Sequence, residues 1–246
     1  MNLSIYNGLR AVKRRAKCLL GLDIALRPEV ALATEFHGTE YGGWAIIPQS
    51  IQSTSVVYSF GIGEDASFDL SLINKYGCEV HGFDPTPKSR EWVDREIRNS
   101  RFVMHPWALN AQDGVLRLFL PKNREHVSAS LAHSALMSDE YFDAPAMRLS
   151  TIMRKLGHPQ VDVLKMDIEG AEYGVIADLC STGAIGRVGQ LLVEFHHWMP
   201  GISPSASRKA LAQLRSVGLR MSWVSQGGHE VLFSRTHSDS KNDNGV

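Results

Sequence analysis

Cysteine and net charge are both scarce in this sequence, and each absence excludes a class of protein. The chain has only three cysteines, Cys18, Cys78 and Cys180, and no Cys-x-x-Cys pair. This excludes a disulfide framework and a zinc knuckle and indicates free thiols in a reducing compartment. Lysine plus arginine and aspartate plus glutamate number 26 each, so no overall field attracts nucleic acid. We therefore expect no nucleic-acid partner.

Long apolar runs are absent as well. No stretch approaches the roughly 20 apolar residues of a membrane-spanning helix, and the first residues lack the ordered charge, apolar core and cleavage site of a signal peptide. We expect a soluble, cytoplasmic protein. A basic amphipathic stretch at residues 9–22 favours a helix packed on the domain with a solvated basic face, with weak peripheral contact with an anionic membrane as the alternative.

The 246 residues, 43% of them hydrophobic, are enough for one sizeable α/β domain. We divide the chain into a helical and lid segment at 1–52, the domain at 53–236 and a polar, disordered tail at 237–246. Glycines and aromatic residues around Trp44 fit two interpretations equally: a lid that folds across a ligand pocket, or a hydrophobic patch under a loop.

A strand, a glycine turn and a helix are predicted between residues 55 and 84. An apolar, β-branched and aromatic run stops at Gly61 and Gly63, helical spacing follows, and the next apolar run ends on Asp84. This is the order of a nucleotide-binding βαβ unit. The glycines let the backbone approach a ligand, and Asp84 can accept the hydroxyl groups of a ribose.

The ligand of this turn is constrained by its charges. The glycine pattern also fits a nicotinamide or flavin dinucleotide, but Glu64 and Asp65 would repel a pyrophosphate. The same pair suits S-adenosyl-L-methionine, which carries a sulfonium, an ammonium and a ribose but no phosphate. An ordinary βα turn with a solvated acidic pair is the structural alternative.

Later segments contribute further candidates. A third strand at 101–105 leads to Trp107 and Ala108, which can flank a base ring at the edge of a doubly wound sheet. Residues 121–144 are polar and too long for a plain connection, so we interpret them as a substrate loop.

Two predicted strands end in acidic and histidine residues. An apolar run at 161–166 is followed by Asp167, Glu169 and Glu172, and we expect Lys165 to neutralise Asp167 in part. The next strand, at 191–198, carries Glu194, His196 and His197 near its end. Since parallel neighbours end at one edge of a sheet, Asp167 and His196 should lie on the same rim. Because ionisable residues from two different strands would meet there, we treat this rim as a candidate site.

Five motifs resemble, in order and spacing, those of the FkbM family of S-adenosylmethionine-dependent methyltransferases. They are Phe-Gly-Ile-Gly-Glu-Asp, His-Gly-Phe-Asp-Pro, His-Pro-Trp-Ala-Leu, Val-Asp-Val-Leu-Lys-Met-Asp-Ile-Glu-Gly-Ala-Glu and Leu-Leu-Val-Glu-Phe-His. The resemblance implies an α/β fold with a Rossmann-like, doubly wound, mostly parallel seven-stranded sheet and a C-terminal antiparallel β-hairpin strand. It also implies that residues 53–236 form a methyltransferase domain.

The resemblance implies a cofactor site as well. S-adenosyl-L-methionine is expected at Gly61, Gly63 and Asp84 and, more loosely, at Trp107 and Ala108. Ser59 stands where many methyltransferases carry an acidic residue two positions before the first glycine. We expect Glu64 or Asp65 to replace that missing charge.

The acceptor atom is predicted to be oxygen. The segment that begins at Asp167 reads Asp-Ile-Glu-Gly, without the Pro-Pro-aromatic run of exocyclic-amine methyltransferases, and the chain has no Pro-Cys dipeptide for C5 chemistry. We expect a hydroxyl on a sugar, a small natural product or a glycolipid. Such a hydroxyl needs a base, and we predict His196, oriented by Asp167 or Glu194. A packed or solvated His196 is the alternative.

Other chemistries stay open. A divalent cation held by Asp167, Glu169 and Glu194 can acidify the hydroxyl, but no metal is predicted. An NAD(P)-dependent oxidoreductase and a non-catalytic Rossmann-fold binding protein are the alternative functions. In each enzymatic case the partner is a small molecule or a saccharide, and the sequence indicates no oligomeric state.

Overall fold

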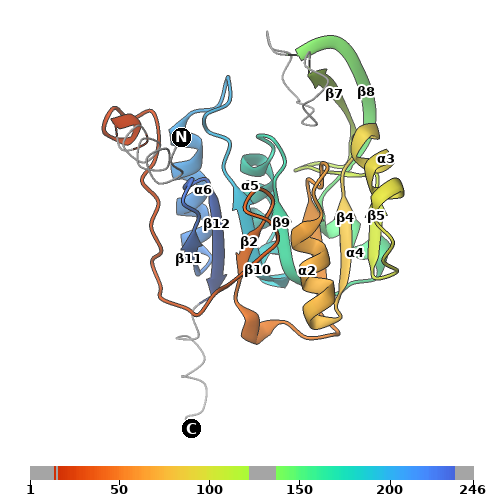
Figure 1. Ribbon diagram of the computed structural model, residues 1–246. Coiled ribbons are helices and arrows are strands. Elements are labelled where there is room, and N and C mark those ends of the chain that lie inside the picture. Colours follow the sequence, from red (N-terminus) through yellow and green to blue (C-terminus); the bar gives the residue numbers. More distant parts are fainter. Residues whose placement is uncertain (1–13, 15, 122–136, 236–246) are drawn as a thin grey trace, which may run out of the picture.

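A seven-stranded sheet forms the centre of the computed structural model, which describes residue 14 and residues 16–121 and 137–235 (Figure 1). The strand order is β11-β12-β10-β9-β3-β4-β5, and β12 alone runs antiparallel to its neighbours. The strands are β3 (Val56–Phe60), β4 (Glu79–Phe83), β5 (Phe102–His105), β9 (Val161–Met166), β10 (Val188–Glu194), β11 (Leu219–Val224) and β12 (Glu230–Arg235). This confirms the predicted fold class.

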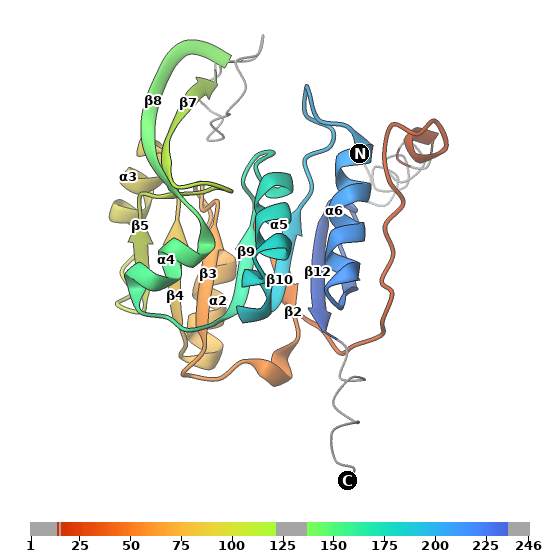
Figure 2. The same ribbon diagram turned by 180° about the vertical axis from the view of Figure 1, so that it is seen from behind.

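Helices cover both faces of the sheet, as a doubly wound fold requires. Figure 2 shows α4, α5 and α6 on one face, and Figure 1 shows α2 on the other. The helices are α2 (Ser67–Tyr76), α3 (Pro87–Glu96), α4 (Leu149–Leu156), α5 (Glu172–Ser181) and α6 (Pro204–Ser216), with short 3-10 turns η1 (Pro48–Ser50) and η2 (Ala184–Arg187). Among the described residues, no helix is long and apolar enough to cross a bilayer.

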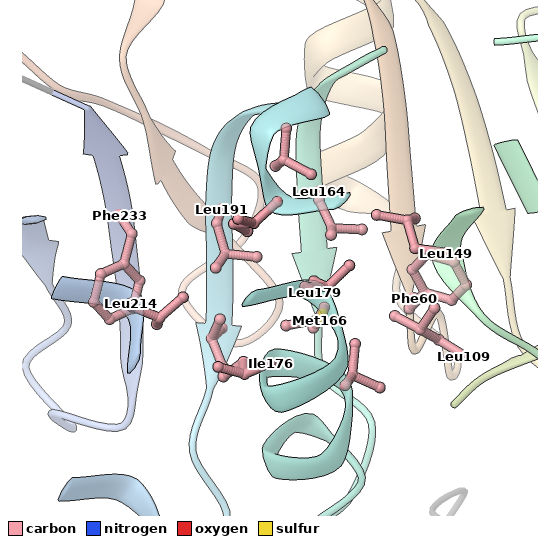
Figure 3. Packing of buried hydrophobic residues seen from close by; sticks show 14 of the residues in the cluster. Phe60, Leu109, Leu149, Leu164, Met166, Ile176, Leu179, Leu191, Leu214 and Phe233 are labelled. Carbon is pink, nitrogen blue, oxygen red and sulfur yellow. The ribbon is translucent and has the colours of Figure 1, made fainter. Parts of the chain in front are cut away.

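Two hydrophobic clusters hold these layers together, one on each face of the sheet. The larger cluster packs Leu164 and Met166 of β9 against Ile176 and Leu179 of α5 (Figure 3). These four side chains are fully buried, and each such burial contributes roughly 1.5–3 kcal/mol. The second cluster joins Phe68 and other residues of α2 to the opposite face. Because both faces of β3 and β9 are covered, the carboxyl ends of these strands are held rigidly in place.

The N-terminal segment adds a two-stranded sheet, β1 (Glu35–His37) and β2 (Trp44–Ile46). Trp44, predicted to belong to a lid, is 3% exposed and packs in the second cluster, while Tyr41 in the turn before it is 94% exposed. The turn therefore projects from a hairpin that is part of the folded body. Residues 237–246, predicted as a disordered tail, and residues 9–13 and 15 of the basic stretch lie outside the described residues.

A second small sheet corrects the predicted substrate loop. β6 (Ala108–Leu109), β7 (Gly114–Pro121) and β8 (Met137–Met147) form a three-stranded sheet, and β7 and β8 extend as an arm beyond the main sheet (Figures 1 and 2). Residues 137–144 are thus strand and not loop, whereas 122–136 lie outside the described residues. The polar residues of β8 gave no alternating apolar pattern because this strand pairs with β7 away from the core.

Candidate active site

A cleft of about 2420 Å³ opens at the carboxyl ends of β3, β4, β9 and β10. The strand order reverses its direction between β3 and β9, which is where open α/β sheets bind ligands. The cleft is lined by all ten residues predicted for the site: Gly61, Gly63, Glu64, Asp65, Asp84, Trp107, Ala108, Asp167, Glu194 and His196. The structure brings these residues together, and their individual roles stay predictions.

Gly61 forms the tightest point of this cleft. Its φ of +83° lies in the left-handed region, and a Cβ there would come within 1.9 Å of the backbone oxygen of Asp167. Its N–H donates to the backbone oxygen of Phe83, at the end of β4, over 2.9 Å. Only glycine fits this position, because the chain after β9 leaves no room for a Cβ on one side of the turn. The other side of the turn faces the cleft.

Asp84 ties the glycine turn to the end of β4. Its Oδ2 accepts the N–H of Gly63 at 2.9 Å, and its Oδ1 accepts the N–H and the hydroxyl of Thr86 at 2.9 and 2.6 Å. The residue is 6% exposed and lines the cleft. Since a carboxylate offers about four lone-pair positions, these bonds leave acceptor capacity for a ribose hydroxyl.

Glu64 and Asp65 already have partners within the protein. Glu64 pairs with Lys88 at 3.0 Å. Asp65 accepts the N–H of Ser67 at 2.7 Å and the hydroxyl of Thr39 at 2.8 Å, and although burial opposes its charge, these bonds lower its pKa on balance. The contact with Thr39 fastens the β1–β2 hairpin to the glycine turn. Because these partners offset the charges of Glu64 and Asp65, the two acids would repel a pyrophosphate less than the sequence alone suggests.

An aromatic wall faces the glycine turn. Phe83 and His105 stack with ring centroids 4.8 Å apart, and Trp107 continues the column 4.7 Å from His105. Burial, with His81 nearby, lowers the pKa of His105 to about 4, so its ring is neutral at physiological pH. Trp107 is half-buried at the cleft, and neighbouring Ala108 leaves room beside it.

Lys165 reaches the glycine turn and not Asp167, contrary to the sequence-based expectation. Its side chain is 5% exposed, and Nζ donates to the backbone oxygen of Gly61 at 2.7 Å and lies 5.7 Å from the ring centroid of Trp44. Buried Asp69 of α2 has its pKa raised to about 6 because burial outweighs the attraction of the Lys165 charge. The charge of Lys165 therefore lies next to the glycine turn and Asp69, and not next to Asp167.

Four carboxylates surround His196. Its Nε2 lies 3.5 Å from Oδ1 of Asp167, 3.7 Å from Oε2 of Glu169 and 3.8 Å from Oε1 of Glu194. Its Nδ1 lies 3.4 Å from Oε1 of Glu172. The predicted proximity of Asp167 and His196 is confirmed, since β9 and β10 are parallel neighbours.

The charges in this group shift one another. Burial disfavours a charged His196, but the Glu172 carboxylate and the other acids outweigh it and raise the pKa of His196 to about 9. Burial, with repulsion from Asp167, raises the pKa of Glu194 to about 8. At neutral pH the imidazole therefore carries a proton in this arrangement, which it must lose before it can accept another proton or bind a metal ion; its role as a base stays a prediction.

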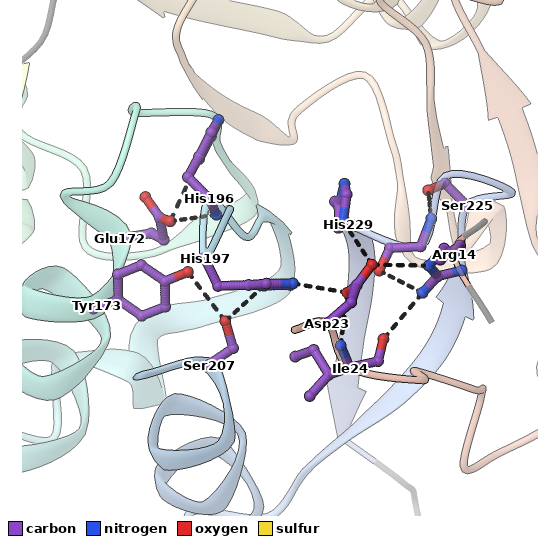
Figure 4. A network of polar contacts seen from close by, with 11 residues as sticks. Arg14, Asp23, Ile24, Glu172, Tyr173, His196, His197, Ser207, Ser225 and His229 are labelled. Atoms are coloured by element: carbon purple, nitrogen blue, oxygen red, sulfur yellow. Dashed lines mark hydrogen bonds and ion pairs between the residues drawn. The ribbon is translucent and has the colours of Figure 1, made fainter. Parts of the chain in front are cut away.

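Glu172 is the member of the group whose role the sequence did not indicate. Its side chain is fully buried, and its carboxylate accepts the backbone N–H of His196 at 2.9 Å (Figure 4). The same carboxylate accepts the N–H of Gly170, also at 2.9 Å. It thus joins the turn after β9 to the turn after β10. An acidic residue in the first turn of a predicted helix was the available signal, but such residues are common there for electrostatic reasons alone.

His197, the next residue, belongs to a separate network (Figure 4). Its Nε2 lies 2.8 Å from Oδ1 of Asp23, and its Nδ1 lies 3.1 Å from Oγ of Ser207 on α6. Arg14 and His229 approach the other oxygen of Asp23, each at 3.7 Å. This Asp23 network fastens the N-terminal segment to the body of the protein beside the acidic group.

Two curated proteins are similar in sequence to this chain. The chain is 32% identical over 161 residues to a human protein called probable methyltransferase-like protein 24, and 30% identical over 159 residues to the rat protein of that name. Each alignment covers 64% of this chain, which spans 37% of the length of these curated relatives.

Two solved structures are also similar to this chain. A methyltransferase from Pyrococcus furiosus shares 14% identity with a TM-score of 0.36, covering 93% of this chain and 97% of that one. Fibrillarin from Aeropyrum pernix, solved with natively bound S-adenosyl-L-methionine, shares 10% identity with a TM-score of 0.40, covering 87% and 85%.

The family match is the most extensive of these sequence similarities. The methyltransferase FkbM domain matches residues 55–221, from the strand before the glycine turn to the strand after α6. It includes every residue of the predicted site and supports a methyltransferase over an oxidoreductase. Because this match covers more than half of the chain, the protein belongs to the methyltransferase FkbM domain family.

Proposed function

We propose that this chain is an S-adenosyl-L-methionine-dependent methyltransferase that methylates a hydroxyl group on a sugar, a small natural product or a glycolipid. Membership in the FkbM domain family supports methyl transfer. The observation that carries the proposal is one cleft in which the glycine turn and Asp84 lie on one side and the His196 group on the other. Cofactor and acceptor can then meet at the ends of β3 and β9.

The cofactor side suits S-adenosyl-L-methionine in its donors and acceptors. Gly61 and Gly63 line the cleft with backbone in a positive-φ conformation, and Asp84 retains acceptor positions for the ribose. Trp107 and Ala108 offer an aromatic face and open space for the base. The acids Glu64 and Asp65 make the surroundings favourable for a cation, although both already hold partners.

The acceptor side supplies a proton acceptor and a fixed charge. Glu194 closes β10, lines the cleft and has a side chain 22% exposed, and its ionised form, which predominates above a pKa of about 8, is assigned the hydroxyl proton. The methyl group comes from the sulfonium of the bound cofactor, whose carbon–sulfur bond breaks as the carbon–oxygen bond forms and leaves the electron pair on sulfur. His196, predicted as the base, is assigned here to hold the surrounding carboxylates in place, because it carries a proton at neutral pH.

Calorimetric titration with S-adenosyl-L-methionine and S-adenosylhomocysteine tests the cofactor directly. We expect micromolar binding to the wild-type protein and its loss in Asp84→Ala, because the glycine turn then loses its anchor on β4. Asp94→Ala, at an exposed position on α3, is the matched control and should bind like the wild type. Absence of binding to the wild-type protein contradicts the proposal. Where binding is found, a screen of hydroxylated acceptors by mass spectrometry should detect addition of a methyl group.

A further inference from the structure

Three carboxylate oxygens surround one ring nitrogen of His196 without bonding to it at normal length. The distances from Nε2 to Asp167, Glu169 and Glu194 are 3.5, 3.7 and 3.8 Å. A hydrogen bond from nitrogen to oxygen is shorter, at about 2.7–3.2 Å. The imidazole as a whole is 2% exposed and lines the cleft, and Nε2 has no hydrogen-bond partner among the described residues. A buried ring therefore aims this nitrogen at a ring of acids with space between them.

These separations match those of ligands that share one ion. Two atoms that each lie about 2.1–2.3 Å from a metal are about 3.0–3.8 Å apart at the angles of tetrahedral or octahedral coordination. The ligand atoms of Asp167, Glu169 and His196 all lie within 4.8 Å of one another. They come from two turns that the sheet fixes side by side, so the group is formed by the fold itself.

Glu172 gives His196 the support that metal-binding histidines receive. Its buried carboxylate lies 3.4 Å from Nδ1 and also accepts the backbone N–H of His196 at 2.9 Å. A carboxylate on the far nitrogen fixes the ring orientation, and an ion that displaces the proton from the other nitrogen meets the lone pair freed there. This is independent of the acidic cluster, because Glu172 acts from the opposite side of the ring.

Two other clusters of histidine and acidic residues lack this openness. In the Asp23 network the carboxylate is bonded to His197 at 2.8 Å, and the guanidinium of Arg14 lies 3.7 Å from it and would repel a cation. At the opposite end of β4, Glu79 lies 2.7 Å from His81 and its side chain is 52% exposed. In both clusters the carboxylate lies within 2.8 Å of the histidine nitrogen, so no space for an ion is left between those two atoms.

We propose that Asp167, Glu169 and His196 bind a divalent metal ion of the manganese class. Carboxylate oxygens with one imidazole suit Mn²⁺, whereas Mg²⁺ prefers oxygen alone and structural zinc favours sulfur and nitrogen. The inference rests on the proposed function and deepens it. An acceptor hydroxyl bound to the ion loses its proton more readily, so that Glu194 is a sufficient base.

Titration of the metal-free, full-length protein with Mn²⁺, followed by electron paramagnetic resonance, tests the site. We expect one saturable site per chain, with affinity at least about tenfold weaker in Glu169→Gln. Glu40→Gln is the matched control, since Glu40 is an exposed acid on the same cleft, and it should bind like the wild type. Absence of saturable binding, or equal affinity in all three proteins, overturns the proposal.

Pulsed electron paramagnetic resonance identifies the nitrogen ligand. Bound Mn²⁺ should show coupling to one imidazole nitrogen in the wild-type protein, and His196→Gln should remove it. Saturable Mn²⁺ binding without any nitrogen coupling overturns the assignment of His196. Circular dichroism of each variant separates a lost ligand from a lost fold.

The two proposals fail in different ways. Binding of S-adenosyl-L-methionine without binding of Mn²⁺ removes the metal site and leaves the methyltransferase. Binding of Mn²⁺ without binding of S-adenosyl-L-methionine removes the proposed function and leaves the metal site.

Discussion

His196 and His197 are joined by one peptide bond but belong to regions of opposite character. His196 faces three carboxylates at 3.5–3.8 Å and opens onto the cleft. His197 bonds through both ring nitrogens, to Asp23 at 2.8 Å and to Ser207 at 3.1 Å. A polar group with complete partners holds the fold together, whereas a buried one that lacks them marks a place for a ligand. We therefore expect His196 to matter for activity and its neighbour His197 to matter for stability.

The substitution His196→Ala is the strongest test of this difference between the two histidines. We expect turnover to fall at least about a hundredfold, because the acidic group loses its central imidazole. Cofactor affinity should change less than about twofold, since the hydrogen bonds of Gly61, Gly63 and Asp84 run to other residues and not to this side chain. Steady-state kinetics and calorimetry measure the two effects. Unchanged turnover would show that the imidazole is only packed there.

His197→Ala should have the reverse effect. It removes the closest side-chain partner of the Asp23 carboxylate, which is 6% exposed. Removing a hydrogen-bond partner from a buried polar group lowers the free energy of unfolding by about 1–3 kcal/mol. Urea denaturation measures this loss, and the protein that stays folded should keep its cofactor affinity.

A double-mutant cycle with Asp23→Asn then isolates the contact. A coupling energy of more than about 1 kcal/mol is expected for two residues in direct contact. A coupling near zero would mean that the stability of this region comes from packing around His197 and not from its bond to Asp23.

The smallest expected effect is a response of the Asp23 network to acid. Burial alone would raise the pKa of Asp23, but the bonds from His197 and from the N–H of Ile24 lower it below its ordinary value of 3.8. A group whose pKa is depressed in the folded protein contributes stability above its unfolded value and loses it as the pH falls through the folded value. The urea midpoint should therefore decline below about pH 4, and less steeply in Asp23→Asn. Equal slopes in both proteins would contradict this.

The sequence predicts the central sheet well because the signal is local. The strand at 56–60, its glycine stop and Asp84 follow from apolar runs and turn residues, and they lie where expected. The meeting of Asp167 and His196 follows equally, since it needs only two adjacent parallel strands.

What the sequence does not predict depends on distant contacts. Asp23 bonds to His197, 174 positions away, and no local pattern marks such a pair. Lys165 is directed to Gly61 by the packing of β3 on β9, not by its spacing from Asp167. The strand β8 lacks an apolar alternation because it lies on the arm.

Gly61 has a consequence for any attempt to re-engineer this protein. Its backbone touches the chain at Asp167 so closely that a single methyl group would displace one of them. A library that varies the glycine turn to accept an altered donor would therefore also shift the residues on the acceptor side. The proposed donor and acceptor sides of the cleft are thus coupled through the contact between Gly61 and Asp167. Selection for a new donor should therefore include compensating changes at the end of β9.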